Sequence, residues 1–284
     1  MHEARTFKAQ LAIAAARLKS AGFHKPGREA RQLMQHVCSM SASDLIREEL
    51  SEMDDKARGA FFDLVERRVS GEPFEYLTGV ASFYGLDFYC TRETLIPRAD
   101  SEVVVDEALA RLPLGRTARV ADLGTGTGCL LIALLKNQPG LSGHAVEKSS
   151  AAAAIARKNL IRHRVRSRAS ITIGSWEDWD GWGDVDLIIS NPPYIRTGTI
   201  ATLDASVRAF EPHDALDGGE DGLEAYRSII SLAAARLKEG AWLVFEIGFD
   251  QREAVTGLLE KAGFGSISCG QDHGQRDRVV AARR

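Results

Sequence analysis

The hydrophobic positions of the first quarter of the chain recur with the spacing of amphipathic helices. Between residue 1 and about residue 75, apolar side chains return every three or four positions. Residues that start and stop helices predict four short helices in this region. Gly22 ends the first, Pro26 lies in the first turn of the second, Ser41 or Ser43 caps the third, and Asp54 caps the fourth. Such a bundle can dock a partner, act as a lid or have no direct role in function, and the sequence of these residues does not distinguish these possibilities.

The pattern changes at about residue 74. Aromatic and apolar residues from Phe74 to Tyr89 interleave with Gly79 and Gly85, which predicts a hairpin-like linker. From Leu95 onward, apolar runs of strand length alternate with helical periodicity. The predicted elements are a helix over 100–112, a strand over 118–123, a helix from 127, a strand ending at 147, a helix over 149–163, strands near 171 and over 184–190, a long loop, a helix over 223–237, a strand over 241–247, a helix over 252–262, and strands near 266–269 and 278–281. This alternation predicts an α/β fold with a doubly wound, mostly parallel sheet.

Composition and charge exclude several classes of protein. The 284 residues are 44% hydrophobic and 26% charged, which is ordinary globular composition. A net charge of -3 gives no overall attraction to nucleic acid. The one dense basic run is Arg162–Arg168. We favour a solvated helix end as its explanation, and contact with an acidic partner is the alternative. Four scattered cysteines and seven scattered histidines form no CxxC or HExxH pattern, so neither a disulfide framework nor a metal site is expected. With no secretion signal and no apolar stretch of about 20 residues, we expect a cytoplasmic protein.

A glycine-rich turn follows the first strand of the predicted sheet. From Gly124 to Gly128 glycine occupies every second position, which lets the backbone bend tightly and approach a ligand. Glu147 ends the next predicted strand, where a carboxylate can accept hydrogen bonds from two ribose hydroxyls. The G-x-G-x-G spacing differs from that of dinucleotide-binding turns, and no lysine follows to form a phosphate loop. Asp122, just before the glycines, suits a cofactor with a cationic tail, such as S-adenosylmethionine.

A proline-locked corner ends the fourth strand of the predicted sheet. The apolar run 185–189 is followed by Ser190, Asn191, Pro192, Pro193 and Tyr194, and two prolines cannot continue a hydrogen-bonded ladder. The carboxyl end of a strand is where ligands bind in open α/β sheets. There the Asn191 side-chain oxygen and the Pro192 carbonyl can each accept a hydrogen bond from a planar NH2 group, while the Tyr194 ring covers its flat face. Taken alone, the corner is explained equally well as a simple turn that ends a strand. The glycine turn upstream changes this balance and favours a site for alkylation of nitrogen.

Trp176 follows the third predicted strand. Its indole is a candidate to wall the adenine of a nucleoside cofactor bound at this edge of the sheet. Packing of the loop is nearly as good an explanation, and Trp179 and Trp182 close by weaken a unique assignment.

The glycine turn, the acidic strand end and the corner together resemble class I S-adenosylmethionine-dependent methyltransferases that act on amide or exocyclic amino nitrogens. The flanking segments narrow the resemblance to the peptide chain release factor glutamine methyltransferases, the PrmC/HemK family. These segments are Leu95–Glu102, Phe210–Leu216, Gly219–Leu223, Phe245–Gly248 and Asp277–Val280.

The resemblance implies a fold, a reaction and partners. The fold is a Rossmann-like seven-stranded sheet over residues 97–284, preceded by a substrate-docking helical bundle over 1–75 and a hairpin linker over 76–96. The reaction is methylation of N5 of the glutamine in the Gly-Gly-Gln motif of release factors, with S-adenosylmethionine as cofactor and S-adenosylhomocysteine as product. The release factor is the protein partner, and a monomer without membrane or direct nucleic-acid binding is expected.

The resemblance also assigns individual residues. The cofactor contacts carry over to Gly124, Thr125, Gly126, Thr127, Gly128, Glu147, Trp176 and Asn191, and the contacts to the substrate amide to Asn191, Pro192, Pro193 and Tyr194. Of these, Asn191, Pro192 and Tyr194 are the expected catalytic residues. Glu147 stands where the family usually has aspartate, and Ser175 where aspartate is frequent. Arg98 can either anchor the helix near Asp100 or reach the substrate loop. Glu211 and Glu246 stay unassigned between contacts with substrate or cofactor and structural pairing with arginine.

Three other functions compete with this one. A methyltransferase for adenine N6 or guanine N2 in nucleic acid shares the logic of the corner, but the acidic charge balance and the flanking segments argue against it. A sister family methylates a glutamine of a ribosomal protein and shares the same core. A cofactor-binding regulator without catalysis is the third, and the intact corner argues against it.

Overall fold

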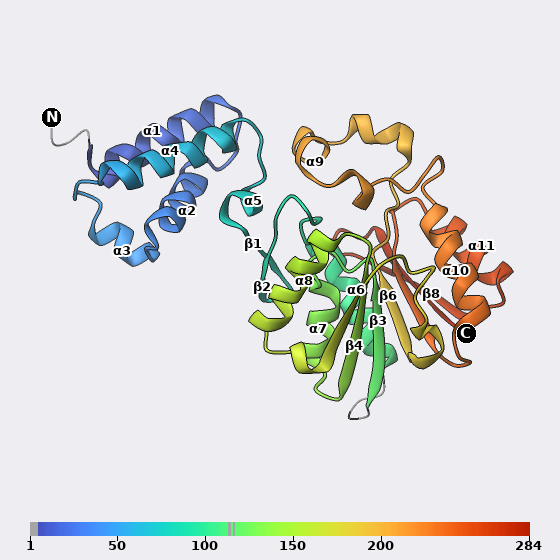
Figure 1. Ribbon diagram of the computed structural model, residues 1–284. Coiled ribbons are helices and arrows are strands. Elements are labelled where there is room, and N and C mark those ends of the chain that lie inside the picture. The colour runs from blue at the N-terminus through green and yellow to red at the C-terminus, as the bar shows by residue number, and fades with distance from the viewer. Residues whose placement is uncertain (1–4, 113–114, 116) are drawn as a thin grey trace. The chain divides into compact units, whose positions relative to one another are not determined.

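The computed structural model describes residues 5–112, 115 and 117–284. The described chain forms two compact units, shown along the chain in Figure 1. The first runs up to Gly79 and includes Ala205–Phe210, and the second comprises Val80–Asp204 and Glu211–Arg284. Residues 1–4 of the predicted bundle lie outside the described residues, and the predicted division at 75 and 96 stays a prediction.

Up to Gly79, the helical unit contains the four predicted helices and a fifth. They are α1 (Phe7–Ser20), α2 (Pro26–Cys38), α3 (Ala42–Arg47), α4 (Asp55–Val69) and α5 (Phe74–Thr78). Ser41 and Asp54 each accept a hydrogen bond from a first-turn amide, which confirms both as caps. The prediction for 74–78 was wrong, because Pro73 starts a helical turn that Gly79 ends in the left-handed region, before the hairpin.

The predicted hairpin is confirmed over a shorter range. β1 (Val80–Phe83) pairs antiparallel with β2 (Leu86–Tyr89). The two turn residues, Tyr84 and Gly85, have φ of 51° and 70°, the sign that a tight two-residue hairpin turn requires at both positions. Phe83 and Phe88 are buried in the core of the second unit, so the hairpin is anchored by its aromatic side chains.

The second unit is built on a seven-stranded sheet, as predicted. Its strands are β3 (Ala118–Leu123), β4 (Leu141–Glu147), β5 (Ala169–Ile173), β6 (Leu187–Ser190), β7 (Trp242–Glu246), β8 (Gly265–Gln271) and β9 (Asp277–Arg283). The order is β5-β4-β3-β6-β7-β9-β8, parallel from β5 to β7 and antiparallel at β9 and β8. β6 starts at Leu187, later than predicted, because Gly181–Asp184 forms the 3-10 helix η4.

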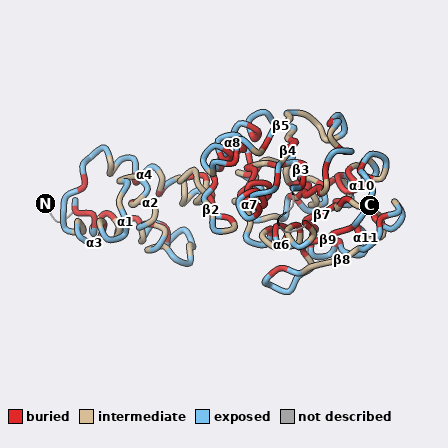
Figure 2. The backbone as a smooth tube through the Cα atoms, turned by 90° about the horizontal axis from the view of Figure 1, so that it is seen from below, coloured by how far each residue is buried: buried red, intermediate tan, exposed pale blue. Residues whose placement is uncertain are grey.

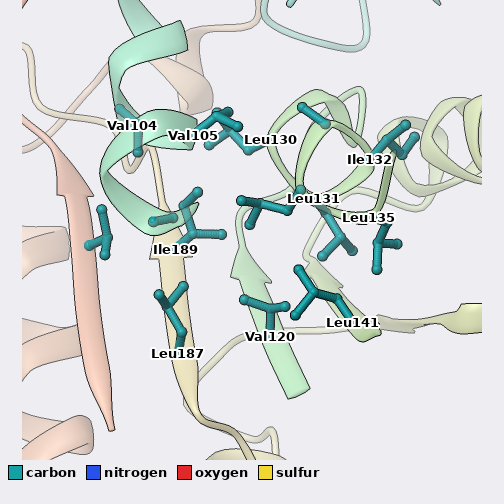
Figure 3. Packing of buried hydrophobic residues seen from close by; sticks show 14 of the residues in the cluster. Val104, Val105, Val120, Leu130, Leu131, Ile132, Leu135, Leu141, Leu187 and Ile189 are labelled. Atoms are coloured by element: carbon teal, nitrogen blue, oxygen red, sulfur yellow. The ribbon is translucent and has the colours of Figure 1, made fainter. Parts of the chain in front are cut away.

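Helices cover both faces of this sheet. They are α6 (Glu102–Arg111), α7 (Cys129–Asn137), α8 (Ser150–Arg162), α10 (Glu224–Arg236) and α11 (Arg252–Lys261). Val120, Leu187 and Ile189 pack against α6 and α7, as Figure 3 shows. The intervening position Ile188 belongs to the opposite core with α10 and α11, because successive strand residues point to opposite faces. Figure 2 shows the buried positions gathered along the central strands and the inner sides of these helices.

The loop predicted between β6 and α10 contains three short helices. These are η5 (Thr197–Thr202), α9 (Ala205–Phe210) and η6 (His213–Ala215). Helices of three to six residues carry too few positions for a hydrophobic period to be recognised, so the sequence pattern could not reveal them. Two further 3-10 helices, η2 (Ala99–Ser101) and η3 (Arg166–Arg168), precede α6 and β5. Among the described residues, no helix has both the length and the apolarity needed to cross a membrane.

The sheet reverses its winding between β3 and β6. From β3 the chain proceeds outward to β4 and β5, and then returns to place β6 on the other side of β3. Ligands of open α/β sheets bind outside the carboxyl ends of the strands at such a switch point. The glycine turn follows β3 and the proline-locked corner follows β6, so both leave the sheet at this point.

Candidate active site

A cleft of about 1180 Å³ opens where the predicted motifs meet. Its wall includes Gly124, Thr125, Gly126, Thr127, Glu147, Trp176, Asn191 and Pro193. Most ligand pockets have volumes of about 300–1,000 Å³, so a nucleoside cofactor and part of a second substrate fit here together. The fold thus brings the glycine turn, the acidic strand end and the asparagine of the corner onto one cavity.

The glycine turn is tied to the neighbouring strand by backbone hydrogen bonds. Gly124 and Gly126 have φ of 72° and 54°, in the left-handed region that favours glycine. The amides of Gly124 and Thr125 donate to the Val146 carbonyl, at 2.9 and 3.2 Å. The Gly126 amide donates to Oε2 of Glu147 at 2.8 Å. The shape of the turn therefore depends on the end of β4 as well as on its own glycines.

Gly128 has a different place from the other two glycines. It is absent from the cleft wall, and it precedes α7 with φ of 81°. A Cβ at this position would lie 3.3 Å from Cδ1 of Ile132 and 3.5 Å from Cβ of Ala156. Gly128 therefore lets α7 start close against α8, and its predicted contact with the cofactor stays a prediction.

A buried carboxyl lies beneath the glycine turn. The Thr125 hydroxyl donates to Oδ2 of Asp122 at 2.6 Å, whereas Oδ1 has no hydrogen-bond partner among the described residues. Burial raises the pKa of Asp122 to about 7, and the charge of Glu147 adds to the increase, while the Thr125 hydrogen bond opposes it. A negative charge here would be stabilised by a cationic ligand lying over the turn.

Hydrogen bonds from several neighbouring segments hold the corner after β6. The buried Ser190 hydroxyl donates to the Leu123 carbonyl at 2.7 Å, which joins the ends of β6 and β3. Backbone amides of Ile195 and Gly218 donate to Leu216 and Ile195, at 3.0 and 2.8 Å, and Nε2 of Gln251 donates to the Tyr194 carbonyl at 3.0 Å. The corner is therefore a fixed part of the site.

Asn191 presents a free carboxamide in this rigid frame. It lines the cleft, and its side chain makes no hydrogen bond with any described residue. Buried or half-buried amides in proteins are normally hydrogen-bonded, so an unpaired one on a residue that lines a cavity is available to a ligand.

The two other catalytic candidates of the corner are not among the residues that line the cavity. Pro192 is buried, and neither Pro192 nor Tyr194 belongs to the cleft wall. The Tyr194 ring packs against the core that includes α10 and α11, and its hydroxyl donates to Oε1 of Glu246 at 3.3 Å. Burial raises the pKa of Tyr194 well above its ordinary value, so the phenol is neutral. Their predicted contacts with a substrate amide stay predictions.

Trp176 forms the wall beside the glycine turn. Its Nε1 donates to the Ser228 hydroxyl at 3.0 Å, and its Cζ3 lies 3.8 Å from where a Cβ on Gly124 would be. Trp179 and Trp182 are both buried in the core and are absent from the cleft wall. The structure thus distinguishes three tryptophans that the sequence left equivalent.

Comparison with known proteins identifies the family. The family described as "PrmC N-terminal domain" matches residues 10–79, and "Methyltransferase small domain" matches residues 101–212. The release factor glutamine methyltransferase of Agrobacterium fabrum is 41% identical over 285 residues, which cover 98% of this chain and 98% of the relative. This chain belongs to the release factor glutamine methyltransferase family. It is an enzyme, as predicted.

Other relatives agree with this assignment. The release factor glutamine methyltransferase of Geobacter sulfurreducens is 44% identical over 222 residues, 78% of this chain and 76% of that one. The solved catalytic domain of hMettl16, in complex with the MAT2A 3′UTR hairpin 6, has a TM-score of 0.56 and 16% identity, and covers 81% of this chain and 82% of that chain. At that identity the likeness shows the methyltransferase fold alone.

Several residues of this methyltransferase site had no predicted role. Arg98 forms an ion pair with Glu211, whose Oε2 also accepts the Ile96 amide at 3.3 Å. The pair joins the segment before α6 to the segment after α9, and pairing with an arginine is the structural alternative left open for Glu211. Ser101, Ser149 and Ser228 line the cleft as well, and only Ser149 had a signal in the sequence, its position just after Glu147.

Two arginines of the basic run donate hydrogen bonds to backbone carbonyls of neighbouring segments. Arg168 donates to the carbonyls of Leu135, Pro139 and Leu141, at 2.6, 3.1 and 2.9 Å. Arg166 donates to the Ala169 carbonyl at 2.7 Å. These guanidinium groups hold the loops around the start of β4 and β5.

Proposed function

We propose that this methyltransferase transfers a methyl group from S-adenosylmethionine to N5 of the glutamine in the Gly-Gly-Gln motif of peptide chain release factors. The observation that carries the proposal is that Asn191, whose carboxamide is unpaired, lines the same cleft as the glycine turn in a chain of this family. A carboxamide recognises another carboxamide well, because each offers one acceptor oxygen and two donor hydrogens.

The residues on the cofactor side fit S-adenosylmethionine. The Glu147 carboxylate is oriented by the amides of Gly126 and Ser149, at 2.8 and 2.9 Å, and each oxygen keeps a lone pair for a ribose hydroxyl. The Trp176 indole can wall the adenine. The cationic part of the cofactor would be attracted by Asp122, whose Oδ1 has no partner in the described chain. These contacts are the proposed cofactor site.

The residues on the substrate side orient the attacking nitrogen. S-adenosylmethionine supplies a sulfonium methyl, so that the new N–C bond forms as the C–S bond breaks, and S-adenosylhomocysteine leaves. The Asn191 Oδ1 and the Pro192 carbonyl accept the two amide hydrogens and stabilise the positive charge that develops on nitrogen. The extra proton then passes to solvent. A neutral amide is a weak nucleophile, and positioning of this kind can contribute about 7–11 kcal/mol.

We further propose a division of labour along the chain. The helical bundle of residues 1–75 would dock the release factor, residues 76–96 would link it to the catalytic domain, and residues 97–284 would carry the chemistry. The helical unit also contains α9, where Phe210 lies 3.9 Å from the position of a Cβ on Gly71. In sequence, α9 belongs to the segment that follows the corner. Docking of a partner on the helical unit would therefore affect the position of that segment.

Mass spectrometry of a purified release factor tests the proposal. The full-length release factor is incubated with the enzyme and S-adenosylmethionine, and its Gly-Gly-Gln peptide is expected to gain the mass of one methyl group. A release factor with asparagine in place of that glutamine is the matched control and should stay unmodified. An unmodified wild-type peptide under saturating cofactor would contradict the proposal.

Charges on the cleft wall disfavour the nucleic-acid alternative. Glu93, Asp214 and Glu220 line the cleft and make no hydrogen bond or ion pair with the described residues through their side chains, against one unpaired lysine, Lys148. Unpaired carboxylates repel a phosphate backbone. Parallel incubations with RNA, duplex DNA and ribosomal proteins separate the alternatives, since methyl transfer is expected only to the release factor.

A further inference from the structure

Glu246 lies next to the corner on the adjacent strand. β6 and β7 are parallel neighbours, and Ser190 is paired with Phe245. The next residues along the two strands are Asn191 and Glu246, so Glu246 leaves β7 at the level where the corner leaves β6.

The Glu246 carboxyl is buried and only half satisfied. The residue is 2% exposed, and Oε1 accepts the Tyr194 hydroxyl at 3.3 Å. Oε2 has no hydrogen-bond partner among the described residues. Burial raises the pKa of Glu246 to about 7, while Ser101, Arg278 and Tyr194 oppose the increase. Because Ser101 itself lines the cleft, Glu246 lies one side chain behind the cleft wall.

The nearby cation does not explain why a carboxyl is kept here. Arg278 lies 3.2 Å from Oδ2 of Asp272 and 3.6 Å from Oδ2 of Asp100, and it donates to the Ile247 carbonyl at 3.4 Å. No ion pair joins it to Glu246 in the described chain. A buried, half-satisfied carboxyl costs stability, and each such group in a native protein calls for a reason.

We propose that Glu246 is a positioning residue for methyl transfer, which holds the Asn191–Tyr194 corner against β7 through the Tyr194 hydroxyl. The proposal rests on the proposed function, because it adds a residue to the same reaction. The Tyr194 carbonyl is already fixed by Gln251, so the hydroxyl bond to Glu246 fixes the other end of the same residue. With both ends held, the two prolines transmit a fixed orientation to Asn191.

Four variants test this role. Glu246→Leu removes the acceptor at similar volume, Tyr194→Phe removes the donor, Glu246→Gln keeps an acceptor oxygen, and the fourth combines Glu246→Leu with Tyr194→Phe. Tyr84→Phe is the matched control, because Tyr84 donates to Oδ1 of Asp106 at 2.6 Å and neither residue lines the cleft. For each protein, kcat and KM with the release factor, the Kd of S-adenosylmethionine and the melting temperature are measured.

The expected result is a selective loss of turnover. Glu246→Leu and Tyr194→Phe each lower kcat about 10- to 100-fold, as small misplacements of reacting groups do, while the cofactor Kd stays within about twofold. The double variant is no slower than the slower single variant, because both changes remove one hydrogen bond. Glu246→Gln restores most of kcat, and Tyr84→Phe keeps it unchanged.

Three results would overturn the inference. They are a wild-type kcat in Glu246→Leu, a double variant whose loss equals the product of the single losses, and a Glu246→Gln variant as slow as Glu246→Leu. Absence of turnover in the wild-type enzyme would overturn the proposed function together with this inference, so the two failures are distinguishable.

Discussion

The Gly126 amide donates a 2.8 Å hydrogen bond to Oε2 of Glu147. Gly126 belongs to the loop after β3 and Glu147 is the last residue of β4, so this bond joins the two halves of the proposed cofactor site. Glu147 also accepts the Ser149 amide through Oε1, at 2.9 Å. The two hydrogen bonds therefore fix the orientation of the Glu147 side chain, and through it the shape of the glycine turn and the start of α8.

Replacement of Glu147 should act mainly on cofactor affinity. Glu147→Ala removes the ribose acceptor and releases the Gly126 amide, and hydrogen bonds to charged groups are worth about 1.5–3 kcal/mol. We expect the Kd of S-adenosylmethionine to rise about 10- to 100-fold by calorimetry, with kcat at saturating cofactor within a few-fold of wild type. Glu239→Ala, an exposed glutamate outside the cleft, is the control. An unchanged Kd in Glu147→Ala would remove the assignment.

Most of the sheet could be predicted because its signals are local. The apolar run of 118–123 is a strand with those bounds, and Glu147 ends β4 as expected. The errors came where short-range pattern is weak. Phe74, Glu75 and Tyr76 alternate between aromatic and polar as in a strand, yet Pro73 and Gly79 enclose one helical turn. The loop before α10 likewise holds helices too short to show a period.

The sequence predicted which motifs form the site, but not the directions in which their side chains point. Asn191 lines the cleft, whereas the hydroxyl of Tyr194, three residues on, donates to Glu246 on another strand. That choice depends on contacts between residues far apart in sequence, as does the pairing of Arg98 with Glu211. The indole of Trp176 was distinguishable from its two neighbours only once the core had taken up Trp179 and Trp182.

Asn191 should matter for turnover and little for stability. Its side chain has no hydrogen bond to lose within the described chain, so Asn191→Ala should leave the melting temperature within about 2 °C of wild type. Loss of one preorganised group at a developing charge typically costs about 100- to 1,000-fold in kcat, and we expect a fall of that order. The measurement is the initial rate of release factor methylation at saturating cofactor.

A matched substitution separates this effect from a general one. Asn137 is exposed at the end of α7 and donates to the Ala133 carbonyl at 2.8 Å, outside the cleft. Asn137→Ala should therefore keep the wild-type rate. Near-normal activity of Asn191→Ala would refute the proposed orientation of the substrate amide.

The ion pair between Arg98 and Glu211 should stabilise the second unit. The Glu211 side chain is 1% exposed and that of Arg98 is 40% exposed, so Arg98→Ala leaves a buried carboxylate with fewer partners. Full burial of an unpaired charge costs about 3–5 kcal/mol, and solvent around Arg98 reduces the expected loss to about 1–2 kcal/mol. Urea unfolding measures it. Arg196→Ala, which breaks an exposed pair with Asp250 at 3.6 Å, should change stability by less than about 0.5 kcal/mol, and an equal loss in both variants would contradict the reasoning.

Asp122 should make the stability of the enzyme depend on pH in a specific direction. Its pKa is about 7 in the folded protein, because of burial, and about 3.9 in the unfolded chain. Between these values the folded state holds a proton that the unfolded state has lost, so this group makes stability fall as pH rises from about 4 to about 7 and adds no further change above that. Asp122→Asn cannot lose a proton and lacks this dependence.

The comparison of Asp122→Asn with wild type is therefore made at two pH values. Near pH 4.5 the two proteins should have similar free energies of unfolding, because folded Asp122 is then protonated and neutral. At pH 8 the variant should be more stable by about 1–4 kcal/mol, the range that a rise of up to three pKa units allows. Urea unfolding without cofactor gives both values, and the other titrating groups cancel in the difference as long as they are independent of Asp122. A stability difference that is the same at both pH values would mean that Asp122 stays ionised beneath the glycine turn, held there by contacts other than a bound cationic ligand.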